Sequence, residues 1–115
     1  MSAAAVQRKK WTIAEYLAME AESPEKHEFF EGEIFAMAGA SPEHNLIVTD
    51  LLYALTGALR GKCRVYASDM RLFLSAAGMY TYGDASVVCG SPEFTDDKPP
   101  SLRNPEMIFE VLSES

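Results

Sequence analysis

Residues 84–89, Asp84-Ala85-Ser86-Val87-Val88-Cys89, form the stretch that decides the fold, because an acid stands at the mouth of an apolar, strand-like run. A second such run, residues 107–112, carries Glu110 26 positions after Asp84. By alternation, Glu110 shares one strand face with two apolar residues while three apolar residues occupy the other, so this strand is expected to be buried on both sides. A carboxylate in a buried strand must be paired, protonated or bound to a metal. The two acids therefore predict a metal site.

Each of these residues also has a plainer interpretation. Asp84 follows Gly83 and could be a turn residue, and Glu110 could be an edge-strand acid that faces solvent. Glu28 lies in a stretch rich in acids and carries no weight alone. His44, in the first turn of a predicted helix, is better explained as a capping or packing residue than as a ligand.

The composition is that of one globular domain. The chain has 115 residues, of which 48% are hydrophobic and 23% are charged. The formal net charge of −7 argues against tight nonspecific DNA binding, because proteins that coat DNA present basic surfaces. The charge does not exclude a nuclease, since acids that hold metal ions add to the negative total.

The cysteines and the apolar runs indicate a cellular compartment. Cys63 and Cys89 match no zinc spacing and give no disulfide framework, so buried thiols in a reducing cytoplasm are expected. No apolar run approaches the ~20 residues needed to span a bilayer. The N-terminus has basic residues with no apolar segment behind them, so it is not a signal peptide. The protein is predicted to be cytoplasmic.

Two helices are predicted from their start signals. Residues 1–10 are expected to be a flexible tail, and Thr12 with Glu15 then forms a capping box that begins a helix over 13–21. Ser41, followed by a proline, begins a second helix over about 43–60. Apolar residues at every fourth position give the second helix a wide stripe that is expected to lie on a sheet.

The remaining segments are predicted to be strands and loops. Gly32 indicates a tight turn between two short strands. Asp69 and Arg71 are expected to form a structural ion pair. Further strands are expected over 63–67, 69–74, 79–89 with a break near Gly83, and 106–112. Residues 90–105, rich in proline, aspartate and serine, are predicted to be an exposed loop.

Four segments occur in a characteristic order: residues 27–34 (HEFFEGEI), 41–45 (SPEHN), 82–88 (YGDASVV) and 109–113 (FEVLS). Together they resemble the bacterial Uma-two family of predicted restriction endonucleases, within the PD-(D/E)XK nuclease superfamily. The resemblance implies an α/β (α+β) fold class, with a restriction-endonuclease-like mixed β-sheet flanked by helices. Residues 11–115 would form the N-terminal part of that single domain.

The resemblance also implies a divalent-metal site that holds Mg²⁺ or Mn²⁺. Asp84 matches the family's first acid, Glu110 its second, and Glu28 an acid from the N-terminal region that joins the same cluster. These three are therefore the predicted catalytic and metal-binding residues. The implied activity is hydrolysis of DNA phosphodiester bonds, in which a metal polarises a phosphate oxygen and lowers the pKa of the attacking water.

Two departures from the family pattern bear on activity. Gly83 stands where the family usually has proline, and Leu112 stands where the superfamily lysine would be. The family supplies that lysine from a helix further downstream, whereas no lysine follows Lys98 here. The chain is therefore expected to be truncated at its C-terminus and to cleave DNA little or not at all.

Two further expectations remain open beside the nuclease. One is a catalytically inactive remnant that keeps the acids, and the other is a protein-interaction module of the same fold. The uncovered apolar strand over 106–112 predicts a homodimer or a larger assembly, because an exposed strand edge pairs readily with another chain.

Overall fold

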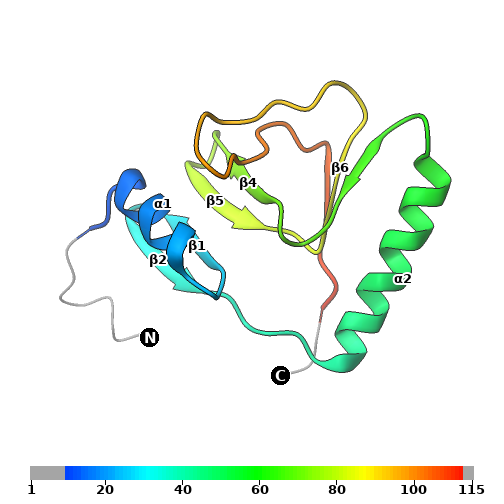
Figure 1. Cartoon of the computed structure of the whole chain (residues 1–115), viewed down its shortest axis with the longest axis horizontal. Coiled ribbons are helices and arrows are strands. Elements are labelled where there is room, and N and C mark those ends of the chain that lie inside the picture. Colours follow the sequence, from blue (N-terminus) through cyan, green and yellow to red (C-terminus); the bar gives the residue numbers. More distant parts are fainter. Residues whose placement is uncertain (1–9, 113–115) are drawn as a thin grey trace.

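The computed structural model describes residues 10–112, so the predicted flexible tail falls almost entirely outside the described residues. Within that range the chain forms two helices and seven strands (Figure 1). In chain order they are α1 (Ile13–Glu22), β1 (His27–Phe30), β2 (Glu33–Ala36), α2 (Pro42–Leu59), β3 (Arg64–Tyr66), β4 (Arg71–Leu74), β5 (Met79–Tyr82), β6 (Ala85–Val88) and β7 (Met107–Phe109). The predicted fold class, helices combined with sheet, is confirmed.

Helix α1 begins at the predicted capping box. The Thr12 hydroxyl accepts a hydrogen bond from the Glu15 amide at 3.1 Å, and the Glu15 carboxylate accepts one from the Thr12 amide at 2.9 Å. The helix buries Tyr16 completely, against Phe29 of β1 and Tyr80 of β5. The Tyr16 hydroxyl also donates to the His27 carbonyl at 2.6 Å. These contacts fix α1 on one face of the sheet that contains β1.

Strands β1 and β2 form the predicted hairpin. Their register pairs His27 with Ala36 and Phe30 with Glu33, which leaves two residues in the turn. Glu31 has a φ of 53° and Gly32 a φ of 80°. Two successive positive φ values are the geometry of a tight hairpin turn, and glycine reaches it without steric cost.

The strands form two antiparallel sheets. One has the order β2-β1-β5-β4 and the other the order β3-β6-β7. The two residues between β5 and β6, Gly83 and Asp84, carry the chain from the first sheet to the second. A Cβ on Gly83 would lie 2.7 Å from Cγ2 of Ile108, so a glycine here lets β7 approach closely.

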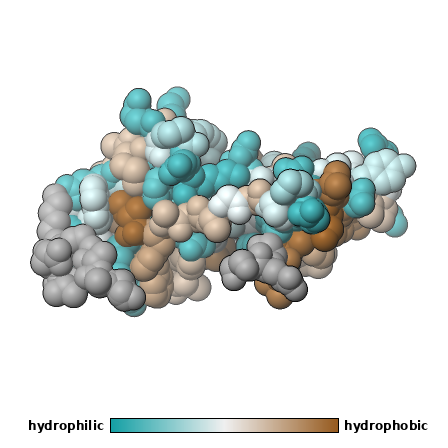
Figure 2. All heavy atoms as spheres, turned by 90° about the horizontal axis from the view of Figure 1, so that it is seen from below, coloured by the Kyte–Doolittle hydropathy of each residue, from teal (hydrophilic) through white to brown (hydrophobic). Residues whose placement is uncertain are grey.

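Helix α2 lies to one side of the strands, next to β3 and β6 (Figure 1). The expectation that its apolar stripe would lie on a sheet is met only in part, because the stripe residues Val48, Leu51, Leu52, Leu55 and Leu59 are half-buried and Ile47 is exposed. No residue of α2 is buried, and Leu46, Ile47 and Tyr53 are exposed. Figure 2 shows apolar surface gathered at this end of the molecule. Periodicity identifies the apolar face of a helix, whereas the width of the opposing surface depends on sheet order.

The segment between β6 and β7 was predicted to be an exposed loop, which is wrong at Ser101 and Leu102. Ser101 and Leu102 are fully buried, and Leu102 packs with Leu72 and Val88. Arg71, expected to pair with Asp69, is buried instead and donates to the Ser101 hydroxyl and the Pro99 carbonyl, both at 2.6 Å. A buried guanidinium needs such acceptors, and a loop distant in sequence supplies them.

Strand β7 was expected to be buried on both faces, and that expectation is also wrong. The strand is the edge of the three-stranded sheet, where Met107 is 45% exposed and Ile108 is 40% exposed. The error arises because apolar alternation describes the side chains of a strand and not the number of neighbours that the strand has.

Cys63 and Cys89 were predicted to be free thiols, yet they form a disulfide. Antiparallel pairing of β3 with β6 sets Arg64 opposite Val88. Cys63, which precedes Arg64, therefore lies opposite Cys89, which follows Val88. No zinc-type spacing is needed for this bond, because strand register joins them across 26 positions.

Candidate functional site

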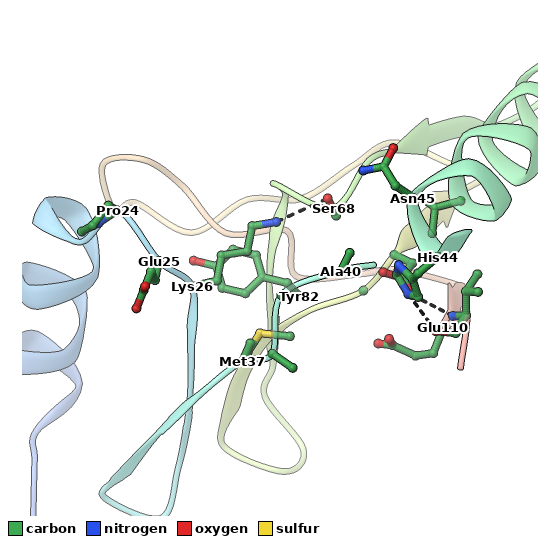
Figure 3. A pocket seen from close by; sticks show the side chains of 16 residues that line it. Pro24, Glu25, Lys26, Met37, Ala40, His44, Asn45, Ser68, Tyr82 and Glu110 are labelled. Carbon is green, nitrogen blue, oxygen red and sulfur yellow. Dashed lines mark hydrogen bonds and ion pairs between the residues drawn. The ribbon is translucent and has the colours of Figure 1, made fainter. Parts of the chain in front are cut away.

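A cleft of about 540 Å³ opens between the N-terminal end of α2 and the junction of β5 with β6 (Figure 3). Its walls come from six parts of the chain. They are residues 24–26 before β1, residues 37–40 after β2, the first turns of α2, Ser68 after β3, residues 82–84 at the end of β5, and residues 110–111 after β7. Asp84 and Glu110 both line this cleft, whereas Glu28 does not.

Asp84 is held rigidly at the junction of the two sheets. Its amide donates to the Phe109 carbonyl at 2.9 Å, and its Oδ2 accepts a hydrogen bond from the Val111 amide at 2.6 Å. These two bonds join the start of β6 to the chain leaving β7. Asp84 is therefore more than a solvated turn residue, because its carboxylate fastens the second acidic segment to the first.

His44 lies next to Asp84, a contact that the sequence did not predict. Ser41 caps α2 by accepting from the His44 amide at 3.1 Å, and this sets the imidazole over the cleft. Its Nε2 lies 2.8 Å from the Val111 carbonyl oxygen and 3.4 Å from Oδ2 of Asp84. Since a carbonyl can only accept, Nε2 carries the proton. The position of His44 in the first turn of a capped helix was the available signal.

Glu110 follows β7, and its carboxyl group interacts electrostatically with the carboxylate of Asp84. Burial of its carboxyl raises the pKa of Glu110, the negative charges of Asp84 and then Glu28 raise it further, and His44 opposes the shift. Glu110 as a residue is exposed, so the expectation of a fully buried acid is wrong. Its side chain nevertheless lines the cleft, where the loss of water disfavours its charged form.

Glu28 lies on β1, the neighbour of β5 in the four-stranded sheet. Its Oε2 accepts a short hydrogen bond from the hydroxyl of Thr81. Its charge reaches Glu110, but its side chain is not among those that line the cleft. The structure thus brings two of the three predicted acids to one cleft and keeps the third near them.

The donor set suits a hard divalent cation, since carboxylate oxygens are the ligands that Mg²⁺ prefers. The mutual repulsion that raises the pKa of Glu110 is also what a bound cation would relieve. The present side-chain positions do not yet converge: among residues 10–112, no group of three His, Cys, Asp or Glu side chains is arranged to hold a metal ion. The ligand types at the site therefore fit such an ion better than the present arrangement of the acidic side chains does.

A second group of polar residues supports the opposite wall. Glu20 is buried in α1 and accepts hydrogen bonds from the His27 amide at 2.7 Å and from the Tyr82 hydroxyl at 2.8 Å. Its other oxygen lies 2.9 Å from Nδ1 of His27. Burial, followed by the hydrogen bond to Glu20 and its charge, raises the pKa of Tyr82 to about 12. Glu20 therefore anchors Tyr82, which belongs to the cleft wall.

The one lysine or arginine among the residues that line the cleft in the described chain is Lys26. Its Nζ lies 2.9 Å from Oδ1 of Asp69 and 3.3 Å from Oγ of Ser68. It also lies 5.5 Å from the centre of the Tyr82 ring. No sequence motif pointed to this residue, because its place in the cleft depends on the packing of the segment before β1 against β5.

Neither of the two helices within residues 10–112 is long and apolar enough to cross a membrane.

Comparisons with known proteins agree with this architecture. A solved structure with a TM-score of 0.62 is described as a putative nuclease belonging to DUF820 from Anabaena variabilis. It is 19% identical to the chain, and the match covers 84% of this chain and 57% of that one. At this identity the likeness shows a shared fold.

Two curated relatives come from Synechocystis. The protein named "Uncharacterized protein sll1609" is 40% identical over 105 residues, which cover 90% of this chain and 59% of the relative. The protein named "Uncharacterized protein slr1290" is 34% identical over 107 residues, which cover 92% of this chain and 55% of the relative. The chain thus spans less than three fifths of the length of either relative.

The profile of the Uma2 family, described as "Putative restriction endonuclease", matches residues 13–115. That range contains Asp84 and Glu110, the histidine that contacts Asp84, and the strand that carries Glu28. The four ordered segments in the sequence indicated the same family. The chain belongs to the Uma2 family.

Proposed function

We propose that this chain carries the metal-binding half of an endonuclease site that hydrolyses DNA phosphodiester bonds. The observation that carries the proposal is the cleft in which Asp84 and Glu110 lie together, with the charge of Glu28 acting on Glu110. Membership of the Uma2 family and the fold shared with a nuclease of DUF820 support it. Mg²⁺ or Mn²⁺ bound there would polarise a phosphate oxygen and activate water.

Each side chain has a distinct task in this proposal. Asp84 and Glu110 would bind the cation, and Glu28 would join them after exchanging its hydrogen bond with Thr81. The Val111 amide holds Oδ2 of Asp84 in place, which lowers the entropy lost on binding. His44 holds the first turn of α2 against the Val111 carbonyl oxygen and Oδ2 of Asp84.

Calorimetric titration with Mg²⁺ and Mn²⁺ tests the metal site. We expect saturable binding by the wild-type chain and strong weakening in Asp84→Asn, which removes a charge and keeps the shape of the side chain. Asp50→Asn is the matched control, because Asp50 is an exposed acid on α2 that does not line the cleft. Equal binding by both variants would refute the site.

Plasmid nicking tests catalysis separately from binding. Cleavage that requires Mg²⁺ and disappears in Asp84→Asn would support a nuclease. Metal binding without cleavage would favour the second candidate, a non-catalytic domain that keeps the acids. In that case the function would rest on DNA or protein binding, and the cleft acids would serve structure.

The exposed edge of β7 favours one accompanying property, self-association into a homodimer. Its outer hydrogen-bonding groups face no partner strand of the described chain, because β6 pairs with the other side. Two exposed apolar side chains, Met107 and Ile108, lie along it. Pairing of two β7 edges would cover both strands. Light scattering tests this, and Ile108→Lys is expected to shift the protein towards monomer. The proposed compartment is the cytoplasm, where the Cys63–Cys89 disulfide would be exposed to reduction, and fractionation of cells with thiol blocking would check both.

A further inference from the structure

We propose that Lys26 binds a phosphate group of a DNA strand that enters the cleft. This inference rests on the proposed function, because it names a substrate contact of the same site. Three acids line the cleft in the described chain, Glu25, Asp84 and Glu110, and Lys26 is the lysine that faces them. A polyanion approaching these acids is repelled unless a fixed positive charge lies on its path.

The position of Lys26 suits that task. Figure 3 shows Lys26 and Ser68 on one side of the cleft and His44 and Glu110 on the other. A strand lying between these sides would have one phosphate at the lysine and the neighbouring part of its backbone towards the acids. The cleft volume of about 540 Å³ lies within the range of pockets that enclose small organic ligands.

The present partners of Lys26 are easily exchanged for a phosphate. Asp69 is 94% exposed in its side chain, so its ion pair with Lys26 is a solvated one, and such pairs contribute little. The bond to Ser68 is long for a hydrogen bond, at 3.3 Å. A phosphate could replace Asp69 on the ammonium group, while the Ser68 hydroxyl could donate to the same phosphate.

The ammonium group of Lys26 is positioned over an aromatic ring of the cleft wall. Its Nζ lies 5.5 Å from the centre of the Tyr82 ring, within the range of a cation–π contact. Tyr82 is in turn anchored by Glu20 and stands two residues before Asp84. The lysine and the first acid are therefore positioned by the same short segment, so the phosphate contact would have a fixed relation to the metal site.

Fluorescence anisotropy with a labelled DNA duplex in Mg²⁺, at several salt concentrations, tests the inference. Lys26→Gln is expected to weaken binding about tenfold and to reduce the slope of log affinity against log salt by about one, as loss of one phosphate contact predicts. Lys62→Gln is the matched control with the same charge change, because Lys62 is exposed and does not line the cleft. It should stay within about twofold of wild type, and Lys26→Arg should retain most of the affinity.

The proposal is overturned if Lys26→Gln and Lys62→Gln bind DNA equally well, or if the wild-type chain binds no DNA at low salt. Thermal melting of Lys26→Gln excludes a folding defect. Calorimetry with Mg²⁺ separates this inference from the metal site: Lys26→Gln should bind Mg²⁺ as wild type does. Loss of DNA binding with retained Mg²⁺ binding supports the phosphate contact, whereas wild type that binds DNA but no Mg²⁺ refutes the metal site alone.

Discussion

The carboxylate of Asp84 accepts a hydrogen bond from the amide of Val111 at 2.6 Å. Together with the bond from the Asp84 amide to the Phe109 carbonyl, this contact joins the start of β6 to the chain that leaves β7, the segment that carries Glu110. Asp84, an acid predicted to bind metal, therefore also fixes the segment that carries the second acid, Glu110.

Replacing Asp84 by alanine should destabilise the fold by about 1–3 kcal/mol, because the Val111 amide loses its acceptor in a part-buried position. Asp84→Asn keeps an acceptor oxygen and should cost less. Urea denaturation measures both values. If the alanine and asparagine variants were equally stable, the hydrogen bond to Val111 would not be the stabilising contact.

The same substitution should change the titration of Glu110. Asp84 is the larger of the two charges that raise the pKa of Glu110, after burial, so Asp84→Asn should lower that pKa towards the usual 4.5. Glu28→Gln should lower it less. Because the folded pKa is raised, the fold loses stability as the pH rises through it, and Asp84→Asn should reduce that loss. Carboxyl-carbon NMR follows the titration, and an unchanged Glu110 pKa would contradict the proposed proximity.

Tyr82 should control stability at alkaline pH. Its pKa is raised from 10.0 to about 12 in the fold, so its protonated state stabilises the fold below pH 10.0. That contribution is lost as the pH rises through about 12. Phenolate absorbance and denaturation across this range provide the measurement. Tyr82→Phe should unfold with a weaker dependence on alkaline pH, and a phenolate that forms near pH 10.0 would count against burial.

The disulfide should contribute measurably to stability. It closes a loop of 26 residues, for which chain entropy gives about 3.5 kcal/mol. The double variant Cys63→Ser, Cys89→Ser should therefore unfold at lower urea than the oxidised wild type. A reductant should lower wild-type stability to the same level and leave the double variant unchanged. Two free thiols in the unreduced protein would disprove the bond.

The loop between β6 and β7 should behave as core at Leu102. Leu102→Ala removes a side chain packed against Leu72 and Val88 and should cost about 2–5 kcal/mol. Leu112→Ala makes the same chemical change at a residue that is 91% exposed and should cost less than about 0.5 kcal/mol. Thermal denaturation compares the two. Similar losses would mean that the loop does not close the core.

Local signals predicted local structure well. The capping box at Thr12, the cap at Ser41 and the turn at Gly32 each depend on hydrogen bonds or dihedral angles within a few residues, and each occurs as expected. The position of Asp84 before one apolar run and of Glu110 within another, together with family motifs, also directed attention to the cleft that both residues line.

Contacts between distant segments could not be read in the same way. The bond between Cys63 and Cys89 follows from the register of β3 against β6. The burial of Arg71 depends on its hydrogen bond to Ser101, which lies 30 residues further along the chain. The exposure of β7 follows from its place at a sheet edge. None of these facts is encoded in periodicity, because periodicity describes one element and not its neighbours.

The sequence by itself determined where the helices, turns and most strands lie, and it singled out Asp84 and Glu110 as acids next to apolar runs. Tertiary structure alone decided that His44 contacts Asp84, that Lys26 lines the same cleft, and that Glu28 does not line it. The physical reason is the range of the interactions. Caps and turns are satisfied within one or two turns of chain, whereas a site gathers side chains from segments that only packing and strand order bring together.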